Sequence, residues 1–115
     1  MNNYRMYKIV ITDYFKKQLK PLVKKNRGLK EDFKEVLLNF NKIQAVSLGM
    51  GIFKIRISGN AKGKSGGYRL CIFILGIEEI LTPVCIYAKN DKENITFKEI
   101  RKHLEKIKIE LYKIF

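Results

Sequence analysis

The sequence predicts an α+β fold: an N-terminal strand, a helical hairpin, a three-stranded antiparallel meander forming one twisted sheet, and a C-terminal helix. Two observations lead to this prediction. Three consecutive runs between residues 51 and 89 have the short length and the β-branched or aromatic composition of strands. Segments before and after them repeat apolar residues at the three- and four-residue spacing of helices. We expect the hairpin to pack on one face of the sheet, with a basic groove on the other.

The N-terminal quarter predicts a strand followed by a lysine-rich helix. Side chains alternate across residues 4–12 in the manner of a strand, and Thr12 or Asp13 can cap the helix that follows. Pro21 lies within this helix and removes one backbone hydrogen bond, so we expect a kink or a break there. The apolar stripe of the helix consists of Phe15, Leu19, Leu22 and Val23.

A second helix completes the predicted hairpin. Its apolar residues recur at i, i+4, i+7, i+8 and i+11, a spacing that builds one buried face. They are Leu29, Phe33, Val36, Leu37 and Phe40. Residues 26–28 form a helix stop or the turn of the hairpin. Residues 41–50 are mixed in character, and we interpret them as a connector that leads into the central strands.

The central strands differ in their expected burial. Residues 51–58 alternate apolar with basic side chains, which is typical of a strand with one covered face. Residues 68–75 and 80–89 are apolar on both faces, which is typical of central strands covered from two sides. Pro83 within the last run predicts a bulge or an unpaired edge at that point.

The C-terminal segment carries the clearest helix signature. Thr96 and Glu99 have the spacing of a capping box. Apolar residues then repeat along one face to the end of the chain, at Ile100, Leu104, Ile107, Leu111 and Ile114. The only histidine, His103, lies in this lysine-rich helix, and we expect it to be solvated.

The size and charge of the chain limit its possible classes. A length of 115 residues favours a single domain over residues 1–115, and 46% hydrophobic residues favour a folded core. The 24 Lys and Arg residues exceed the 11 Asp and Glu residues, which gives a net charge of +13. That excess indicates a nucleic acid, an anionic membrane or an acidic protein as the partner.

A membrane location is disfavoured by the apolar pattern. The longest uncharged apolar run, residues 70–77, is far shorter than the ~20 residues of a spanning helix. Residues 1–5 show no secretory signal. Cys71 and Cys85 lie within strands without metal-ligand spacing, so we interpret them as reduced core thiols. We therefore expect a cytoplasmic protein that binds no metal.

The three strands bring basic residues to one face of the predicted sheet. Because successive strand side chains point to opposite faces, one face can collect cations from all three strands. Its residues are Lys54, Arg56, Arg69, Tyr87 and Lys89. The loop of residues 59–65, which we call the Gly/Lys loop, adds Lys62 and Lys64 at the edge. The sequence predicts no carboxylate on this face, so a phosphate backbone is the expected partner.

The pattern excludes one activity and favours another. GNAKGKS at 59–65 has three residues between its first glycine and GKS, where a P-loop has four, and a strand follows it. We therefore reject nucleotide triphosphate hydrolysis. Cleavage of RNA needs neither metal nor cofactor, because the 2′-hydroxyl beside each phosphate is an internal nucleophile that Lys, Arg and Tyr can assist.

KIRI, GKSGGYR and IYAKNDKEN follow one another in that order, before the capped helix. In this arrangement the chain resembles the RelE-like toxins of bacterial toxin–antitoxin systems, and the HigB type most of all. The resemblance implies an mRNA interferase that cleaves messenger RNA in the ribosomal A site and is blocked by a cognate antitoxin. By motif position it assigns RNA binding and cleavage to Arg56, Lys64, Arg69 and Lys89. A catalytic His or Glu of some relatives is missing, which leaves the base unassigned.

The leading hypothesis is a toxin that acts as a ribosome-dependent endoribonuclease without a cofactor. We assign its catalysis to Arg56, Lys64, Arg69, Lys89 and Tyr87, and additional RNA binding to Lys54 and Lys62. The expected partners are mRNA on the 30S A site and a HigA-like antitoxin with a helix-turn-helix domain. Two alternatives remain open, namely a non-catalytic nucleic-acid-binding module and a gyrase-directed toxin of the related ParE type.

Overall fold

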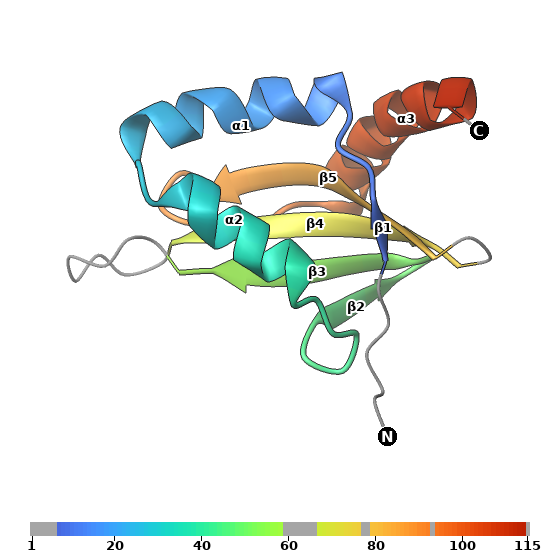
Figure 1. Ribbon diagram of the computed structural model, residues 1–115, viewed down its shortest axis with the longest axis horizontal. Coiled ribbons are helices and arrows are strands. Elements are labelled where there is room, and N and C mark those ends of the chain that lie inside the picture. The colour runs from blue at the N-terminus through green and yellow to red at the C-terminus, as the bar shows by residue number, and fades with distance from the viewer. Residues whose placement is uncertain (1–6, 59–66, 77–78, 93, 115) are drawn as a thin grey trace.

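The structure is a computed structural model that describes residues 7–58, 67–76, 79–92 and 94–114. Within these residues, three helices pack on a five-stranded sheet (Figure 1). The strand order is β1-β5-β4-β3-β2, and neighbours are antiparallel except for the parallel pair β1 and β5. The predicted α+β class is confirmed. The elements are β1 (Lys8–Ile9), α1 (Asp13–Lys25), α2 (Leu29–Leu38), β2 (Val46–Gly49), β3 (Ile52–Ile57), β4 (Tyr68–Leu75), β5 (Ile80–Ala88) and α3 (Phe97–Ile114).

The segment before the meander contains a strand that the sequence pattern does not reveal. The interpretation of residues 41–50 as a connector is wrong at its C-terminal end, because Val46–Gly49 pairs with β3 at the sheet edge. The chain reverses through residues 49–51, whose φ angles of 88°, 57° and 79° all lie in the left-handed region. A Cβ on Gly51 would lie 2.9 Å from the Ile74 carbonyl oxygen, so this close approach requires glycine.

Helix α1 continues without a break across its proline. Thr12 caps the helix as predicted, because its hydroxyl accepts a hydrogen bond from the Phe15 N–H at 3.1 Å. A break at Pro21, one of the two predicted outcomes, does not occur. Pro21 is exposed, whereas Phe15 is fully buried and stacks on Phe33 with 5.4 Å between ring centroids. Packing on the inner side therefore keeps the helix continuous.

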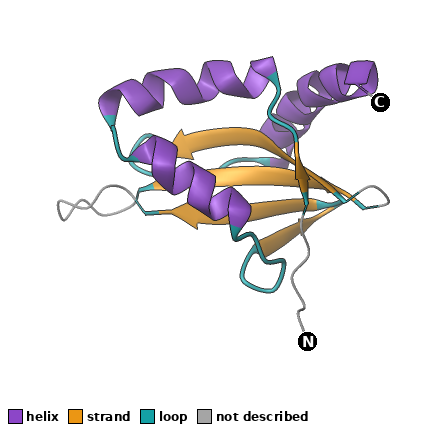
Figure 2. Ribbon diagram, in the orientation of Figure 1, coloured by secondary structure: helices purple, strands orange, loops and turns teal. Residues whose placement is uncertain are grey.

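Helices cover both faces of the sheet. The helices α1 and α2 cover the face to which Phe53, Ile55 and Leu70 point, and we call it the hairpin face. Phe40, just after α2, packs edge-on against Phe53 with 5.6 Å between the ring centroids. Helix α3 packs on the opposite face, where the Lys108 ammonium lies 5.7 Å from the centre of the Phe73 ring. Figure 2 shows α2 in front of the strands and α3 partly behind them. The predicted position of the hairpin is confirmed.

Strand β5 contains the bulge that its proline predicts. The pairing of β4 with β5 shifts by one residue next to Pro83, and Val84 is the extra residue. The side-chain amide of Gln18 in α1 satisfies the backbone at this point. It donates to the Val84 carbonyl at 3.0 Å and accepts from the Ile86 N–H at 3.3 Å. The bulge thereby fixes α1 on the hairpin face.

Helix α3 also fixes the start of α1. The Glu110 carboxylate accepts hydrogen bonds from the N–H groups of Asp13 at 2.8 Å and Tyr14 at 2.9 Å. The Tyr14 hydroxyl is hydrogen-bonded to Nδ1 of His103 at 2.6 Å. The prediction that His103 is solvated is therefore wrong. Its partner lies 89 positions away in the sequence, and burial between the two helices lowers the pKa of His103.

Candidate functional site

Three side chains form a row across the centre of the sheet, on the face opposite the hairpin. Arg56 of β3 lies directly opposite Arg69 of β4, and Arg69 lies directly opposite Tyr87 of β5. We call these three residues the cross-strand row. Lys54 belongs to the same face, one step along β3, where it lies opposite Cys71. The register thus brings together residues that are up to 33 positions apart in the numbering of the chain, from Lys54 to Tyr87.

The other predicted residues lie at the end of the row or outside the described residues. Lys89 is exposed just beyond β5, and its N–H donates to the Gly67 carbonyl at 3.0 Å, which holds it near the start of β4. Lys62 and Lys64 belong to the Gly/Lys loop, which lies outside the described residues. The structure therefore places the strand-borne part of the predicted site and leaves the loop-borne part as a prediction.

The cross-strand row places two positively charged side chains next to each other. Two like charges directly opposite each other in a sheet repel, and Arg56 and Arg69 are such a pair. Arg56 is exposed and Arg69 half-buried, so a ligand can reach both. Nη1 of Arg69 donates to the Tyr68 carbonyl at 3.3 Å, which steadies its guanidinium group. A phosphate bound here can accept charge-assisted hydrogen bonds from both arginines.

Tyr87 adds a protonated hydroxyl to the row. Its oxygen is buried and, among the residues that the structure describes, has no hydrogen-bond partner. Burial is the main cause that raises the pKa of Tyr87; Cys71 and Cys85 raise it further, and Arg69 opposes them. The hydroxyl therefore keeps its proton at neutral pH, and it can donate this proton to a ligand only when binding uncovers the buried oxygen.

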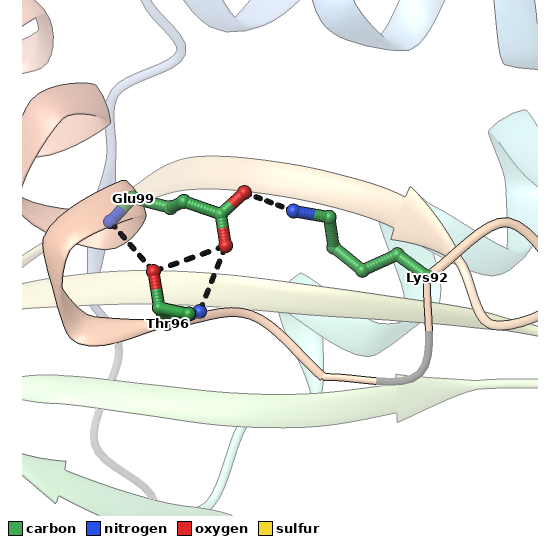
Figure 3. Close-up of polar contacts among 3 residues, drawn as sticks. All are labelled: Lys92, Thr96 and Glu99. Atoms are coloured by element: carbon green, nitrogen blue, oxygen red, sulfur yellow. Dashed lines mark hydrogen bonds and ion pairs between the residues drawn. The ribbon is translucent and has the colours of Figure 1, made fainter.

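A capping box lies beside this face, at the start of α3 (Figure 3). The Glu99 carboxylate accepts hydrogen bonds from the N–H of Thr96 at 2.9 Å and from its hydroxyl at 3.1 Å. The Thr96 hydroxyl in turn accepts from the Glu99 N–H at 3.1 Å, so the predicted capping box is confirmed. The other carboxylate oxygen of Glu99 pairs with the Lys92 ammonium. This ion pair, with the Thr96 hydrogen bonds, lowers the pKa of Glu99 to about 2.

Glu99 also corrects one expectation about the electrostatics of the site. The sequence places no carboxylate on the basic face, yet the Glu99 charge is close enough to raise the pKa of Tyr87. The capping pattern explains why Glu99 begins a helix, but it does not show that this helix starts beside β5. Lys92, which binds Glu99, has no such pattern and could not be identified from its sequence position alone.

Two buried thiols lie on the same face, next to the cross-strand row. Cys71 and Cys85 are direct partners across β4 and β5, and both are buried and free of disulfide bonds. A hydrogen bond between the two thiols lowers the pKa of Cys71 and raises that of Cys85. Their position as core thiols is as predicted. In the described part of the chain, no cluster of three or more His, Cys, Asp or Glu side chains could hold a metal ion.

A cavity of about 300 Å³ lies on the hairpin side, away from the cross-strand row. Its lining combines apolar side chains with amides and one carboxylate: Val36, Phe40, Ala45, Ile55, Asn39, Asn41, Gln44 and Glu35. None of the predicted site residues lines it. The chemistry on the basic face is therefore separate from this cavity.

Known proteins share this arrangement of strands and helices. The family model for the RelE toxin of the RelE/RelB toxin–antitoxin system matches residues 7–113. The chain belongs to the RelE toxin family. A free-state structure of an arginine-substituted mutant of the E. coli toxin RelE has a TM-score of 0.51 and 18% identity, covering 85% of this chain and 97% of that chain. At this identity the likeness concerns the fold. No curated protein shows a significant sequence match.

Membership of the RelE family identifies the chain as the toxin of a toxin–antitoxin system. It also implies a cognate antitoxin as the partner of this toxin. The matched region contains the hairpin, the cross-strand row and nearly all of α3. None of the helices in the described residues has the length and apolar content that crossing a bilayer requires.

Proposed function

We propose that this RelE-family toxin is a ribosome-dependent endoribonuclease of the HigB type, which cleaves mRNA in the 30S A site and thereby inhibits translation and growth. It acts in the cytoplasm as a single domain over residues 1–115. One observation supports the proposal above all others. The cross-strand row places two arginines and a protonated tyrosine side by side on one face of the sheet, where Arg56 is exposed and Arg69 is half-buried.

In the proposed reaction, the 2′-hydroxyl of one nucleotide gives up its proton to a water molecule and attacks the adjacent phosphorus. Arg56 and Arg69 bind the non-bridging phosphate oxygens and stabilise the charge that grows on them in the transition state. Tyr87 is protonated before the step, as its raised pKa implies, and donates this proton to the departing 5′-oxygen. The reaction forms a 2′,3′-cyclic phosphate and a 5′-hydroxyl end, and it requires no metal or cofactor.

The remaining basic residues have binding roles in this proposal. Lys54 lies on the same face as the row, and Lys89 lies at its end, where each can contact a neighbouring phosphate. Lys62 and Lys64 belong to the Gly/Lys loop, outside the described residues, and we propose RNA binding for Lys62 and a catalytic role for Lys64. Ribosomal RNA and mRNA together supply the anionic surroundings that a chain of net charge +13 requires.

The cognate antitoxin is proposed to be HigA-like, with a helix-turn-helix domain. An acidic segment of such a partner fits the basic face by charge and would block access to the cross-strand row. Binding that is controlled by charge should weaken steeply as the salt concentration rises. An affinity that does not respond to salt would show that apolar contacts elsewhere hold the complex.

The test compares two single substitutions that remove the same charge. Arg69→Ala removes a guanidinium group from the row, and Lys30→Ala removes an ammonium group from the exposed side of α2. Each purified variant is incubated with ribosomes carrying a defined mRNA, and single-turnover cleavage is followed by primer extension. Arg69→Ala should lose ~10²–10³ in rate, as for the loss of one transition-state donor. Lys30→Ala should cleave at the wild-type rate.

Cleavage by Arg69→Ala at the wild-type rate would overturn the proposed active site. The gyrase-directed alternative predicts a different result in cells, where expression would induce the DNA-damage response and leave transcripts intact. A non-catalytic binding module would retain ribosome binding in the wild type and show no cleavage product.

A further inference from the structure

The outer side of α1 carries an uninterrupted group of cations. Lys16, Lys17, Lys20 and Lys24 are all exposed, and we call them the lysine stripe. Successive helical residues are separated by 100°, so Lys17, Lys20 and Lys24 lie within a narrow sector of the helix surface. This sector is opposite to Phe15, which is fully buried. The stripe therefore points away from the sheet.

The neighbouring helix α2 shows that such a stripe is not required of a surface helix in this fold. On α2, the exposed Lys30 and Lys34 alternate with acidic residues, and Lys34 lies 4.0 Å from the Glu31 carboxylate. In α1 the one carboxylate, Asp13, lies 3.9 Å from Lys16. No ion pair among the described residues involves Lys17, Lys20 or Lys24. In the described part of the chain, therefore, no ion pair offsets the repulsion between these lysines.

The lysine stripe and the cross-strand row lie on opposite sides of the sheet. Helix α1 is anchored on the hairpin face through Phe15 and through the Gln18 bonds to β5. The row lies on the other face, the one on which α3 packs. A single strand of RNA bound along the row cannot also follow the stripe without passing around the sheet. The two cationic surfaces therefore require two separate anionic segments.

We propose that the lysine stripe of α1 is a second RNA-binding surface, which holds the phosphate backbone of a duplex segment while the opposite face holds the substrate strand. The phosphate-binding surface follows from charge and placement alone, whereas the choice of RNA as the duplex rests on the proposed function. From Lys17 to Lys24 the helix rises about 10 Å. Duplex nucleic acid presents about six charges over that length.

The chemistry of the stripe favours a phosphate backbone over a protein or a membrane. None of the large hydrophobic side chains exposed in the described residues belongs to α1. Protein interfaces depend on buried aromatic, Arg or aliphatic anchors, and helices that lie on membranes need a free apolar face. In α1 the apolar face is already used in the core. Lysine ammonium groups contact phosphates without reading sequence, which suits a docking role.

The test uses two triple variants with equal charge changes. The first is Lys17→Ala/Lys20→Ala/Lys24→Ala in the stripe. The matched control, Lys30→Ala/Lys34→Ala/Lys42→Ala, removes three exposed lysines from α2 and the loop after it. Binding to a 2′-O-methyl RNA duplex, which cannot be cleaved, is measured by fluorescence anisotropy over a range of salt concentrations. Circular dichroism verifies that both variants are folded.

The stripe variant should lower the slope of log K against log salt by about two to three units, since each lost phosphate contact contributes ~0.9. The control should lower it by less than about one unit. An unchanged slope in the stripe variant, or an equal loss in the control, would overturn the proposal. Loss of binding to a polyglutamate peptide with unchanged binding to the duplex would do so as well.

Cleavage of ribosome-bound mRNA separates this proposal from the proposed function. At saturating ribosome concentration the stripe variant should cleave at the wild-type rate, because the cross-strand row is intact. If the wild type cleaves nothing, while the stripe variant still loses duplex binding, the nuclease proposal fails and the second surface stands. If the wild type cleaves and the stripe variant keeps full duplex binding, the second surface fails alone.

Discussion

The two faces of the sheet use the same strands for opposite purposes. On the hairpin face, Leu70 of β4 is fully buried under α1 and α2. One residue earlier in the same strand, Arg69 points to the other face and remains half-exposed. Helix α3 covers the part of that other face where Phe73 is buried, whereas Arg56 of the cross-strand row is exposed. Strand alternation decides which residues share a face, but the covering helices decide which of them a ligand can reach.

The largest expected effect distinguishes the two faces by stability. Leu70→Ala should lower the free energy of unfolding by about 2–5 kcal/mol, because it leaves a cavity in the core. Arg56→Gln, on the open face, should change it by less than about 0.5 kcal/mol, since Arg56 is exposed and faces a like charge. Urea denaturation of both variants measures the difference. Equal losses would show that the cross-strand row is part of the structural core.

A smaller effect is expected where α3 joins the two layers at the sheet edge. Glu110→Ala removes the acceptor for two N–H groups at the start of α1 and should cost about 1–2 kcal/mol. Glu105→Ala, exposed on the same helix, is the control and should stay within about 0.5 kcal/mol of the wild type. Thermal and urea denaturation test both. A wild-type stability for Glu110→Ala would mean that α1 does not depend on α3.

The smallest effect concerns pH at the same junction. The pKa of His103 is lowered below its ordinary value of 6.5, mainly by burial, so the unfolded chain binds this proton more readily than the folded one. The contribution of His103 to stability is therefore complete above about pH 6.5 and is lost as the pH falls toward its folded pKa. Urea denaturation at about pH 7.5 and about pH 5.5 should show this decrease. His103→Asn should show a shallower decrease, and an identical one would exclude His103 as its source.

Most of the fold follows from local patterns in the sequence. The capping residues Thr12 and Thr96 are fixed by chemistry within three positions of the helix start, and the structure confirms both. Pro83 likewise marks the bulge, because a missing N–H disrupts the ladder wherever it occurs. Strand β2 could not be predicted from local patterns. It has only four residues, and its pairing depends on a glycine turn whose left-handed φ angles are not visible in the residue pattern.

The candidate site is predictable only in part. Alternation along each strand shows which residues of that strand share a face, but a one-residue slip between strands would separate Arg56, Arg69 and Tyr87 onto opposite faces. The direct opposition of the three is set by the register, which the sequence alone does not supply. Contacts between distant segments are harder still. The proximity of Glu99 to Tyr87 and the bond between Tyr14 and His103 depend on where α3 packs.

The central claim is that opposite members of the cross-strand row act on one phosphate. A double-mutant cycle of Arg69→Ala and Tyr87→Phe, measured as single-turnover cleavage of ribosome-bound mRNA, tests it most directly. Each single variant should lose ~10²–10³ in rate, and the double variant should lose much less than the product of the two losses. If either single variant cleaves at the wild-type rate, or if the two losses multiply fully, the residues do not act together on one phosphate.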